Sequence, residues 1–287
     1  MKGKYQERRI NREKQWPPCH LDKLVRLELV EREKGEGYSA NTQRGSEKKA
    51  VKRTPLAYGD LFKVESGKRR VRKVLVEGDA GIGKTTLCIA VSEDWANGKL
   101  FQQFELVLLL PLRMKALASA GSLPELLQLL HPSPRLCDSV ARYLEDEEGE
   151  SVLIIADGWD ELGESQQQEG SFLYQFLFGH RFCHISVVVT SRPSASAPLH
   201  ELPDIDRFVE VCGFSKEHIV EYIQSEFTSN QGKADSLREQ LEGNPLVESV
   251  CSVPLNCAIV CHLWRTLEEA LPTTMTELYT KLRMILV

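Results

Sequence analysis

The sequence has no hydrophobic run long enough to span a lipid bilayer, and residues 1–14 lack the apolar core of a secretory signal peptide. We therefore expect a cytoplasmic protein without a membrane span. Internal repeats and long low-complexity tracts are also lacking. The eight cysteines are scattered without a CxxC pair, which disfavours both a disulfide framework and a zinc ribbon.

The tightest group of cysteines leaves one metal site open. A helix would place Cys257 and Cys261 on one face, with Cys251 and His262 nearby. The residues among and after them are mostly apolar, so we favour buried free thiols over a metal site.

The charge is distributed unevenly along the chain. Residues 1–73 contain 21 Lys and Arg against 10 Asp and Glu, whereas the remainder contains 15 against 31. A basic arm ahead of an acidic body leaves contact with nucleic acid or an acidic membrane open. The basic residues of the arm alternate with Glu, however, and aromatic residues for base stacking are nearly absent. We therefore favour a solvated, weakly structured segment and linker over residues 1–54.

From about residue 55 the sequence predicts alternating strands and helices. A short helix is expected at 23–34, followed by a polar, glycine-containing linker. Runs that are apolar on both faces and separated by helical patterns are typical of buried parallel strands. Residues 55–211 thus predict an α/β sheet covered on both sides. The expected strands are 71–77, 104–110, 151–156, 184–190 and 207–211, and the expected helices are 84–96, 122–130, 135–147 and 165–180.

Strand patterns end at residue 212, and residues 212–287 predict a small all-helical domain. Ser215 can cap the first helix, and a second helix around 235–242 ends at Gly-Asn-Pro. A third helix follows Pro254, and a fourth begins near Thr274, which has capping-box spacing to Glu277.

A phosphate-binding loop is predicted at residues 78–85, which match GxxxxGK[ST] between a strand and a helix. The glycines let backbone N–H groups converge on phosphate oxygens, and the positive end of the following helix adds to the attraction. Lys84 is expected to reach the β- and γ-phosphates, Thr85 to hold Mg²⁺ and Thr86 to contact the α-phosphate. The candidate nucleotide-binding residues are Gly78, Asp79, Ala80, Gly81, Ile82, Gly83, Lys84, Thr85 and Thr86.

Two further segments supply polar groups at strand ends. Five apolar residues lead into Asp157, which is placed to bind Mg²⁺ directly or through water. Asp160 or Glu161 is then a candidate to orient and deprotonate the attacking water. Arg192 follows another apolar strand by two residues. If that strand lies between the other two, Arg192 points at the γ-phosphate and can distinguish a triphosphate from a diphosphate.

Together these segments resemble the NACHT domain of NOD-like receptors, which are switches within the STAND class of P-loop ATPases. The resemblance covers about 55–287, and the Asp-Gly-x-Asp-Glu motif is more specific than the phosphate loop alone. It rests on VLVEGDAGIGKTTL (74–87), LIIADGWDEL (153–162), VVVTSRP (187–193), VCGFSKEHIVEYI (211–223), CSVPLNCAIVCHLW (251–264) and LPTTMTELYTKL (271–282).

The resemblance implies a P-loop NTPase sheet of strand order 5-1-4-3-2, followed by a helical domain that closes over the nucleotide. It implies that Pro254 packs on adenine and that the segment 54–62 closes the base pocket, with Tyr58 as a contact. It also implies a switch in which ADP holds a closed state and ATP permits self-association through NACHT contacts. Hydrolysis is then slow, and the compartment is the cytoplasm.

The chain also departs from the family pattern, and alternatives remain open. No winged-helix domain or leucine-rich repeat is recognised, so we expect a truncated receptor, a gene fragment or a member that relies on partners. One alternative is an AAA-type motor, for which Arg181 or Arg207 would be the arginine finger. The other is a nucleic-acid-binding NTPase using the basic arm. The guanine motif N-K-x-D is not found, which favours adenine.

Overall fold

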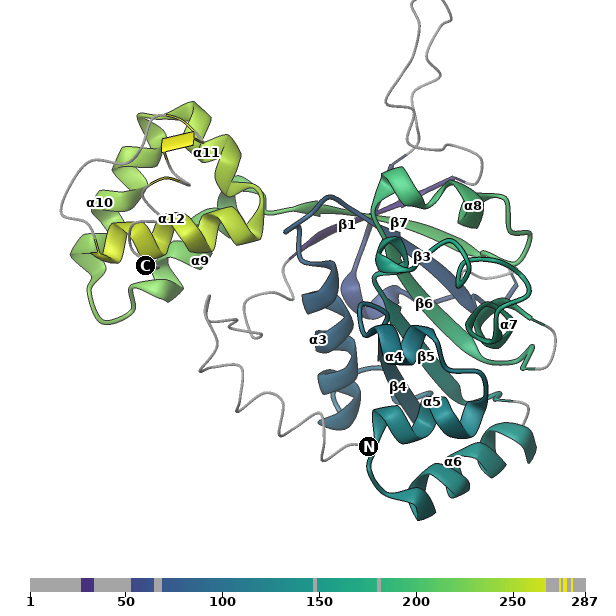
Figure 1. Cartoon of the computed structure of the whole chain (residues 1–287). Coiled ribbons are helices and arrows are strands. Elements are labelled where there is room, and N and C mark those ends of the chain that lie inside the picture. Colours follow the sequence, from purple (N-terminus) through teal and green to yellow (C-terminus); the bar gives the residue numbers. More distant parts are fainter. Residues whose placement is uncertain are drawn as a thin grey trace, which may run out of the picture. The chain divides into compact units, whose positions relative to one another are not determined.

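The computed structural model describes residues 27–33, 53–64, 69–146, 149–179 and 182–266, together with positions 274, 276, 277 and 280. Over these residues the chain forms two compact units (Figure 1). The sheet unit contains 29–79 and 84–211, and the helical unit contains 80–83 and the chain from Cys212 onward.

The described part of the sheet unit is built on seven strands in the order β2-β1-β7-β3-β6-β5-β4. The pairs β7–β3, β3–β6, β6–β5 and β5–β4 are all parallel. Numbered along the chain, these five strands have the order 5-1-4-3-2, which confirms the prediction. The bounds are β1 (Glu28–Arg32), β2 (Thr54–Leu56), β3 (Lys73–Glu77), β4 (Leu106–Pro111), β5 (Val152–Asp157), β6 (Ser186–Ser191) and β7 (Arg207–Gly213).

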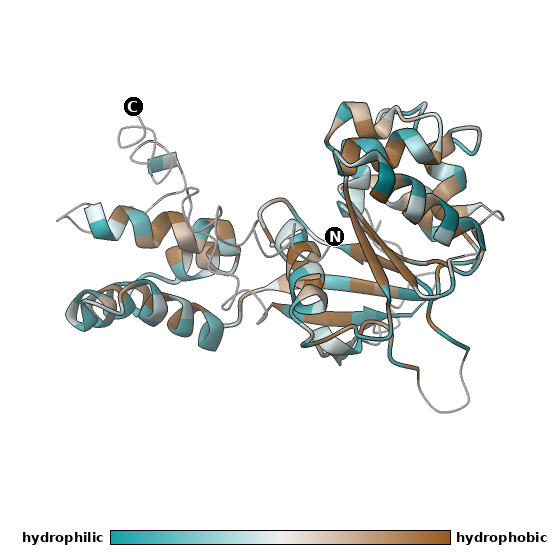
Figure 2. Ribbon diagram, turned by 90° about the horizontal axis from the view of Figure 1, so that it is seen from below, coloured by the Kyte–Doolittle hydropathy of each residue, from teal (hydrophilic) through white to brown (hydrophobic). Residues whose placement is uncertain are grey.

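Burial explains why these segments become central strands. Every residue of β3, β5 and β6 is buried, and strands covered on both faces favour continuous β-branched runs. Figure 2 shows the strands mainly in brown, the hydrophobic end of the scale. The hydrophobic core is therefore centred on the sheet. The strands whose ends carry the candidate site are packed within that core.

Helices connect the parallel strands and pack alongside the sheet (Figure 1). The first of them, α3, begins at Lys84, and its buried positions include Leu87 and Val91. Helix α5 begins after Ser122, whose side chain accepts a hydrogen bond from the Glu125 amide. The bounds are α3 (Lys84–Ala96), α4 (Lys115–Ala118), α5 (Leu123–Leu130), α6 (Pro134–Asp146), α7 (Phe172–Phe178) and α8 (Ala197–His200), with 3-10 turns η1 (Tyr58–Asp60), η2 (Trp159–Glu161) and η3 (Pro193–Ala195).

The helix expected at 23–34 is wrong where the chain is described, because Glu28–Arg32 is strand β1. Leu27 and Leu29 are buried while Glu28 between them is exposed, so the local pattern alternates with a period of two. A window this short fits a helical and a strand period equally well. Ion pairs across the sheet decide between them, since Arg32 contacts Glu210 of β7. The weakly structured segment predicted over 1–54 therefore contains a strand of the sheet, and most of its remainder lies outside the described residues.

The helix expected at 165–180 is shorter in the structure, where α7 spans Phe172–Phe178. Residues 164–169 are all polar and form turns and bends, so a helix there would have no apolar face to bury. Ser171 then starts α7, because its side chain accepts a hydrogen bond from the Tyr174 amide.

The helical unit contains α9 (Lys216–Glu226), α10 (Gln231–Glu242), α11 (Pro245–Cys251) and α12 (Pro254–Thr266). Ser215 caps α9 as predicted. Helix α11 was not predicted. Asn244, which belongs to the Gly-Asn-Pro segment expected to end the second helix, caps α11 by accepting a hydrogen bond from the Val247 amide. The Glu277 amide donates to the Thr274 hydroxyl as expected for a helix start, while most of that predicted helix lies outside the described residues.

Candidate nucleotide site

The phosphate loop joins the end of β3 to the start of α3. Gly81 and Gly83 have φ values of 76° and 108°, a region that side chains other than glycine rarely adopt. The Lys84 Nζ atom donates to the carbonyl O atoms of Gly78 at 2.6 Å and Asp79 at 3.0 Å. The loop therefore curls around the ammonium group, as a loop that wraps a phosphate group requires.

The electrostatic surroundings of Lys84 show which charges lie near it. Burial lowers the pKa of Lys84 below its ordinary value of 10.5, and the nearby Arg192 lowers it further. Asp160, Asp157 and Asp79 act in the opposite direction. Two cations and three carboxylates from separate parts of the sequence thus gather at one end of the sheet.

Asp157 ends β5, and only 6% of its surface is exposed. Its Oδ1 atom accepts a hydrogen bond from the Thr190 hydroxyl at 2.9 Å and a weaker one from the Cys88 thiol at 3.7 Å. Both donors thus contact the same carboxylate oxygen, Oδ1. The buried carboxylate is therefore oriented by β6 and α3.

The turn after Asp157 depends on Gly158, which has a φ of 93°. Its amide donates to the Thr190 Oγ1 atom at 2.9 Å, so Thr190 contacts both the strand end and the turn. Trp159 then enters the core completely and packs against Tyr174 and Phe178. This anchor fixes the direction in which Asp160 and Glu161 leave the turn.

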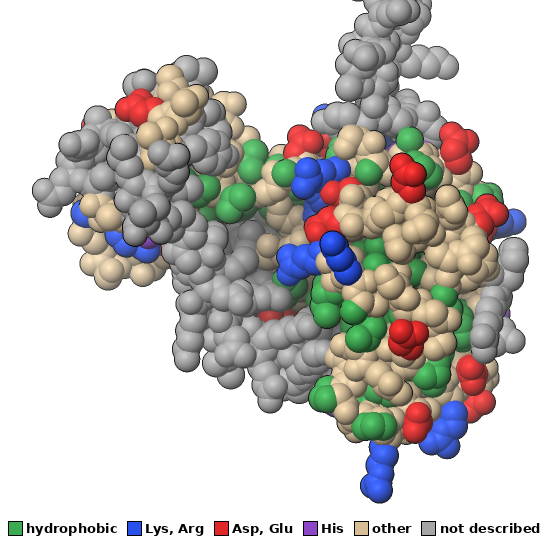
Figure 3. Space-filling view, in the orientation of Figure 1, with side chains coloured by type: hydrophobic (Ala, Val, Ile, Leu, Met, Phe, Trp, Pro, Cys, Tyr) green, Lys and Arg blue, Asp and Glu red, His purple; other side chains and the backbone are tan. Residues whose placement is uncertain are grey.

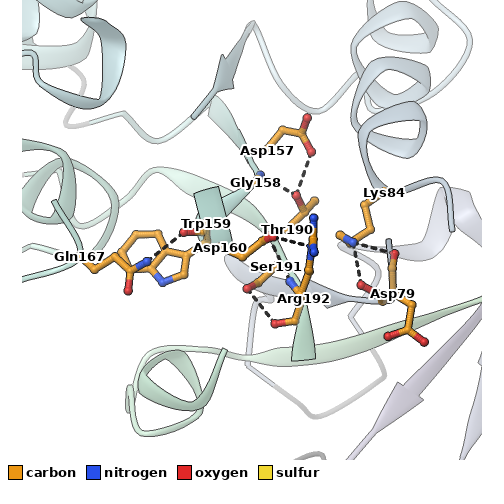
Figure 4. A network of polar contacts seen from close by, with 11 residues as sticks. Asp79, Lys84, Asp157, Gly158, Trp159, Asp160, Gln167, Thr190, Ser191 and Arg192 are labelled. Carbon is orange, nitrogen blue, oxygen red and sulfur yellow. Dashed lines mark hydrogen bonds and ion pairs between the residues drawn. The ribbon is translucent and has the colours of Figure 1, made fainter. Parts of the chain in front are cut away.

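Arg192 and Asp160 form a two-point contact (Figure 4). The Arg192 Nε atom lies 2.9 Å from Asp160 Oδ2, and the Arg192 backbone amide donates to Asp160 Oδ1 at 3.2 Å. Strand β6 lies between β3 and β5, so Arg192 leaves the sheet between the loop and Asp157. The Arg192 side chain is 54% exposed, whereas that of Asp160 is 10% exposed.

The remaining residues of the candidate site differ in exposure. Thr85 and Thr86 are partly buried in the first turn of α3, and Glu161 is exposed. Within the helical unit, the Leu255 amide donates to the Gly81 carbonyl O atom at 3.3 Å. Pro254 directly precedes Leu255 and is buried at the start of α12, so this helix start contacts the tip of the loop.

Tyr58 is not brought to the phosphate loop. Its ring packs against Phe101 with centroids 5.4 Å apart. Burial raises the pKa of the Tyr58 phenol, and the nearby Asp94 carboxylate raises it further. Asp94 lies ten residues after Lys84 in α3, which is about 15 Å farther along the helix. Tyr58 is therefore a core residue beside α3. Its contact with the base stays a prediction.

Sequence reasoning missed Thr190 and Cys88, the two donors to Asp157. Thr190 is the first polar side chain after the buried run Val187–Val189, and a buried hydroxyl there needs a hydrogen-bond partner. That requirement would have been a usable clue. Nothing comparable in the sequence distinguishes Cys88 from an ordinary apolar position of α3.

Two alternative assignments gain no support from the described residues. Cys251, Cys257 and Cys261 are buried free thiols, as favoured from the sequence. Among the described residues no group of three or more His, Cys, Asp or Glu side chains is arranged to hold a metal ion, so the metal alternative at these cysteines and His262 gains no support. Arg207 is buried and bonded to Glu31 and to three backbone carbonyls, which leaves it unsuited to act as an arginine finger. Arg181 lies outside the described residues.

The nucleic-acid alternative rests on the basic arm, most of which lies outside the described residues. On the face shown in Figure 3, the basic side chains of the described surface are interspersed with acidic ones. Such mixed charge is a poor match for a phosphate backbone.

Comparison with known proteins identifies a family. The model of the NACHT domain matches residues 72–230. The mouse (Mus musculus) NACHT, LRR and PYD domains-containing protein 3 is 32% identical over 70% of this chain and 20% of its own length. The human (Homo sapiens) NACHT, LRR and PYD domains-containing protein 12 is 32% identical over 72% of this chain and 21% of its own.

A third relative, the human Protein NLRC5, is 31% identical over 79% of this chain and 13% of its own length. The chain thus spans about a fifth or less of the length of these curated relatives. Over the part of the chain that the structure describes, no helix combines the length and the apolar character that crossing a membrane requires.

Proposed function

Because the chain belongs to the NACHT domain family, we propose that it is a nucleotide-binding switch module that takes ADP or ATP with Mg²⁺. The observation that supports this most is the convergence of Lys84, Asp157 and Arg192 at one end of the sheet. A module of this kind acts because the bound nucleotide biases a conformational equilibrium.

The described residues fit a magnesium nucleotide. The two left-handed glycines shape a loop whose amides are available to phosphate oxygens. Lys84 would exchange its two carbonyl partners for the β- and γ-phosphates, and Thr85 and Asp157 would hold the cation. Mg²⁺ favours one or two protein oxygens together with phosphate oxygens and waters, so two protein ligands suffice. When bound, it neutralises charge on the phosphates.

Hydrolysis would be slow, because one candidate base is already engaged. Asp160 is held by Arg192, whereas Glu161 on the same turn is exposed. We propose that Glu161 orients the attacking water and that Asp160 positions Arg192 until a γ-phosphate competes for the guanidinium group. An arginine that contacts only the third phosphate can distinguish ATP from ADP.

The proposal also covers the contact to the adenine base and the association of the module with other chains. We propose that Pro254, at the helix start beside the loop, packs on the base. We also propose that the module self-associates through its NACHT domain and acts in the cytoplasm in innate immune signalling, as a part of a longer NOD-like receptor would. The names of the curated relatives support this setting.

Isothermal titration calorimetry of the chain with ADP, ATP and GTP, each with and without Mg²⁺, tests the proposal. We expect ADP and ATP to bind at micromolar concentrations or tighter and GTP to compete poorly. Removing Mg²⁺ with EDTA should weaken ATP binding by about tenfold or more, since the unneutralised phosphates then face Asp157. If neither adenine nucleotide binds, or if GTP binds as tightly as both, the assignment is wrong.

A further inference from the structure

Glu77, the last residue of β3, is a buried carboxylate directly before the phosphate loop. Only 1% of its surface is exposed. Its Oε1 atom accepts a short hydrogen bond from the Ser196 hydroxyl and lies 3.1 Å from the Nε2 atom of His200. A carboxylate oxygen accepts, so Nε2 carries the hydrogen. Two side chains that follow β6 are thus tied to the end of β3.

This network is costly to the fold. Among the described residues, neither Glu77 Oε2 nor His200 Nδ1 has a hydrogen-bond partner, although both atoms are buried. Buried polar atoms without partners destabilise a folded protein, and an apolar pair would cost less. Stability alone therefore gives no reason for a glutamate and a histidine at these positions.

The arginines near the end of β7 pair with Glu210, whereas Glu77 contacts His200. In the parallel ladder Glu77 is the register partner of Glu210 on β7, so the two side chains leave the sheet on the same face. Glu210 is neutralised from the other side by Arg32 and Arg53. The His200 ring stacks on Phe208 of β7 at 4.8 Å between centroids, which holds it against Glu77.

The network connects the two parts of the candidate site that touch different phosphates. Gly78, which follows Glu77, supplies a carbonyl to Lys84, and its amide donates to Ser191 at 3.3 Å. On the other side, Ser196 and His200 lie four and eight residues after Arg192. Glu77 therefore joins the segment that carries Arg192 to the first peptide of the phosphate loop.

We propose that Glu77, Ser196 and His200 are positioning residues that hold Arg192 at a fixed distance from the phosphate loop and so set the preference for ATP over ADP. This inference rests on the proposed function. Without the network, the Arg192 side chain is no longer held within reach of the γ-phosphate, while contacts to the first two phosphates remain.

The test compares two replacements of His200 in calorimetric titrations with Mg-ATP and Mg-ADP. His200→Leu keeps apolar volume against Phe208 but removes the donor to Glu77. We expect it to weaken ATP binding by about tenfold, the size expected for one hydrogen bond to a charged group, and ADP binding by less than about twofold. His200→Gln retains a donor near the Nε2 position and should restore the ATP preference to within about threefold.

Matched variants separate positioning from folding. Glu201→Gln removes a charge from the exposed neighbour of His200 and should leave both affinities unchanged. Glu77→Gln keeps the side-chain shape and should lower the ATP preference in the same direction, which provides a second readout if His200→Leu unfolds.

Three outcomes would overturn the inference, and they can be told apart. If His200→Leu and Glu77→Gln weaken ATP and ADP equally, or if His200→Gln fails to restore the preference, the network is only structural and the proposed function stands. If the wild-type chain binds neither nucleotide, the proposed function fails and this inference fails with it.

Discussion

Replacing Lys84 with alanine is expected to weaken binding of both ADP and ATP by about 100-fold or more. In the proposed site Lys84 would donate charge-assisted hydrogen bonds to phosphate oxygens, and losing two of them is worth roughly 3–5 kcal/mol. Calorimetric titration measures the loss directly. The matched control is Lys115→Ala, which removes an exposed lysine from α4 and should leave both affinities unchanged.

Replacing Lys84 with methionine should leave the fold intact. Burial lowers the pKa of Lys84, which means that the charged ammonium form is less stable in the folded chain than in water. Because the folded pKa lies below the ordinary value of 10.5, this penalty is present at neutral pH and is relieved as the pH rises toward 10.5. Lys84→Met, which keeps the aliphatic stem, should therefore unfold near pH 7 at the same temperature as the wild type or higher. A variant that unfolds well below the wild type would give Lys84 a structural role and undermine the phosphate assignment.

Replacing Arg207 with alanine is expected to destabilise the sheet unit by about 3–5 kcal/mol, because it breaks a buried ionic network. The Arg207 Nε atom lies 3.1 Å from Glu31. Its two Nη atoms donate to the carbonyls of Asp60, Leu61 and Lys63 at 2.7–3.0 Å. One planar guanidinium group thus joins β7 to β1 and to the segment after β2. Its loss removes one bond to a carboxylate and three to carbonyls, of which the Asp60 carbonyl keeps another donor, the Lys63 amide.

Thermal unfolding measures this loss, which should lower Tm by on the order of 10 °C. Arg207→Lys should recover less than half of it, because an ammonium group cannot reproduce the fork of donors. The control Arg70→Ala breaks a longer, exposed ion pair of 3.6 Å with Glu150 and should cost no more than about 1 kcal/mol. If Arg207→Ala instead abolished ATP turnover with Tm unchanged, Arg207 would be an arginine finger and the motor alternative would return.

The central sheet and its loop were predictable from sequence for physical reasons. Parallel strands buried on both faces need continuous apolar runs. Such runs predicted strands at 71–77, 151–156 and 184–190, and the observed strands lie at 73–77, 152–157 and 186–191. The loop was predictable because few sequences place glycine where a left-handed backbone must precede a helix. The strand order came from the family resemblance, and the structure confirms it.

Features that depend on distant partners were not predictable. The segment around Leu29 satisfies two periods, and only its ion pairs with β7 decide that it is a strand. The Thr190 contact joins residues 33 positions apart, and the Glu77–His200 contact spans 123 positions. Tyr58 was assigned to the base pocket by resemblance, whereas its packing against Phe101 has no signal in the sequence.

The most direct test of the central claim is a crystal structure of the chain with ADP and Mn²⁺, with the metal located from its anomalous scattering. We expect the diphosphate to lie against the amides of residues 79–85. The metal should lie about 2.1 Å from the Thr85 hydroxyl and reach the Asp157 carboxylate directly or through one water. A nucleotide bound elsewhere, or a metal held by neither residue, would contradict the central claim.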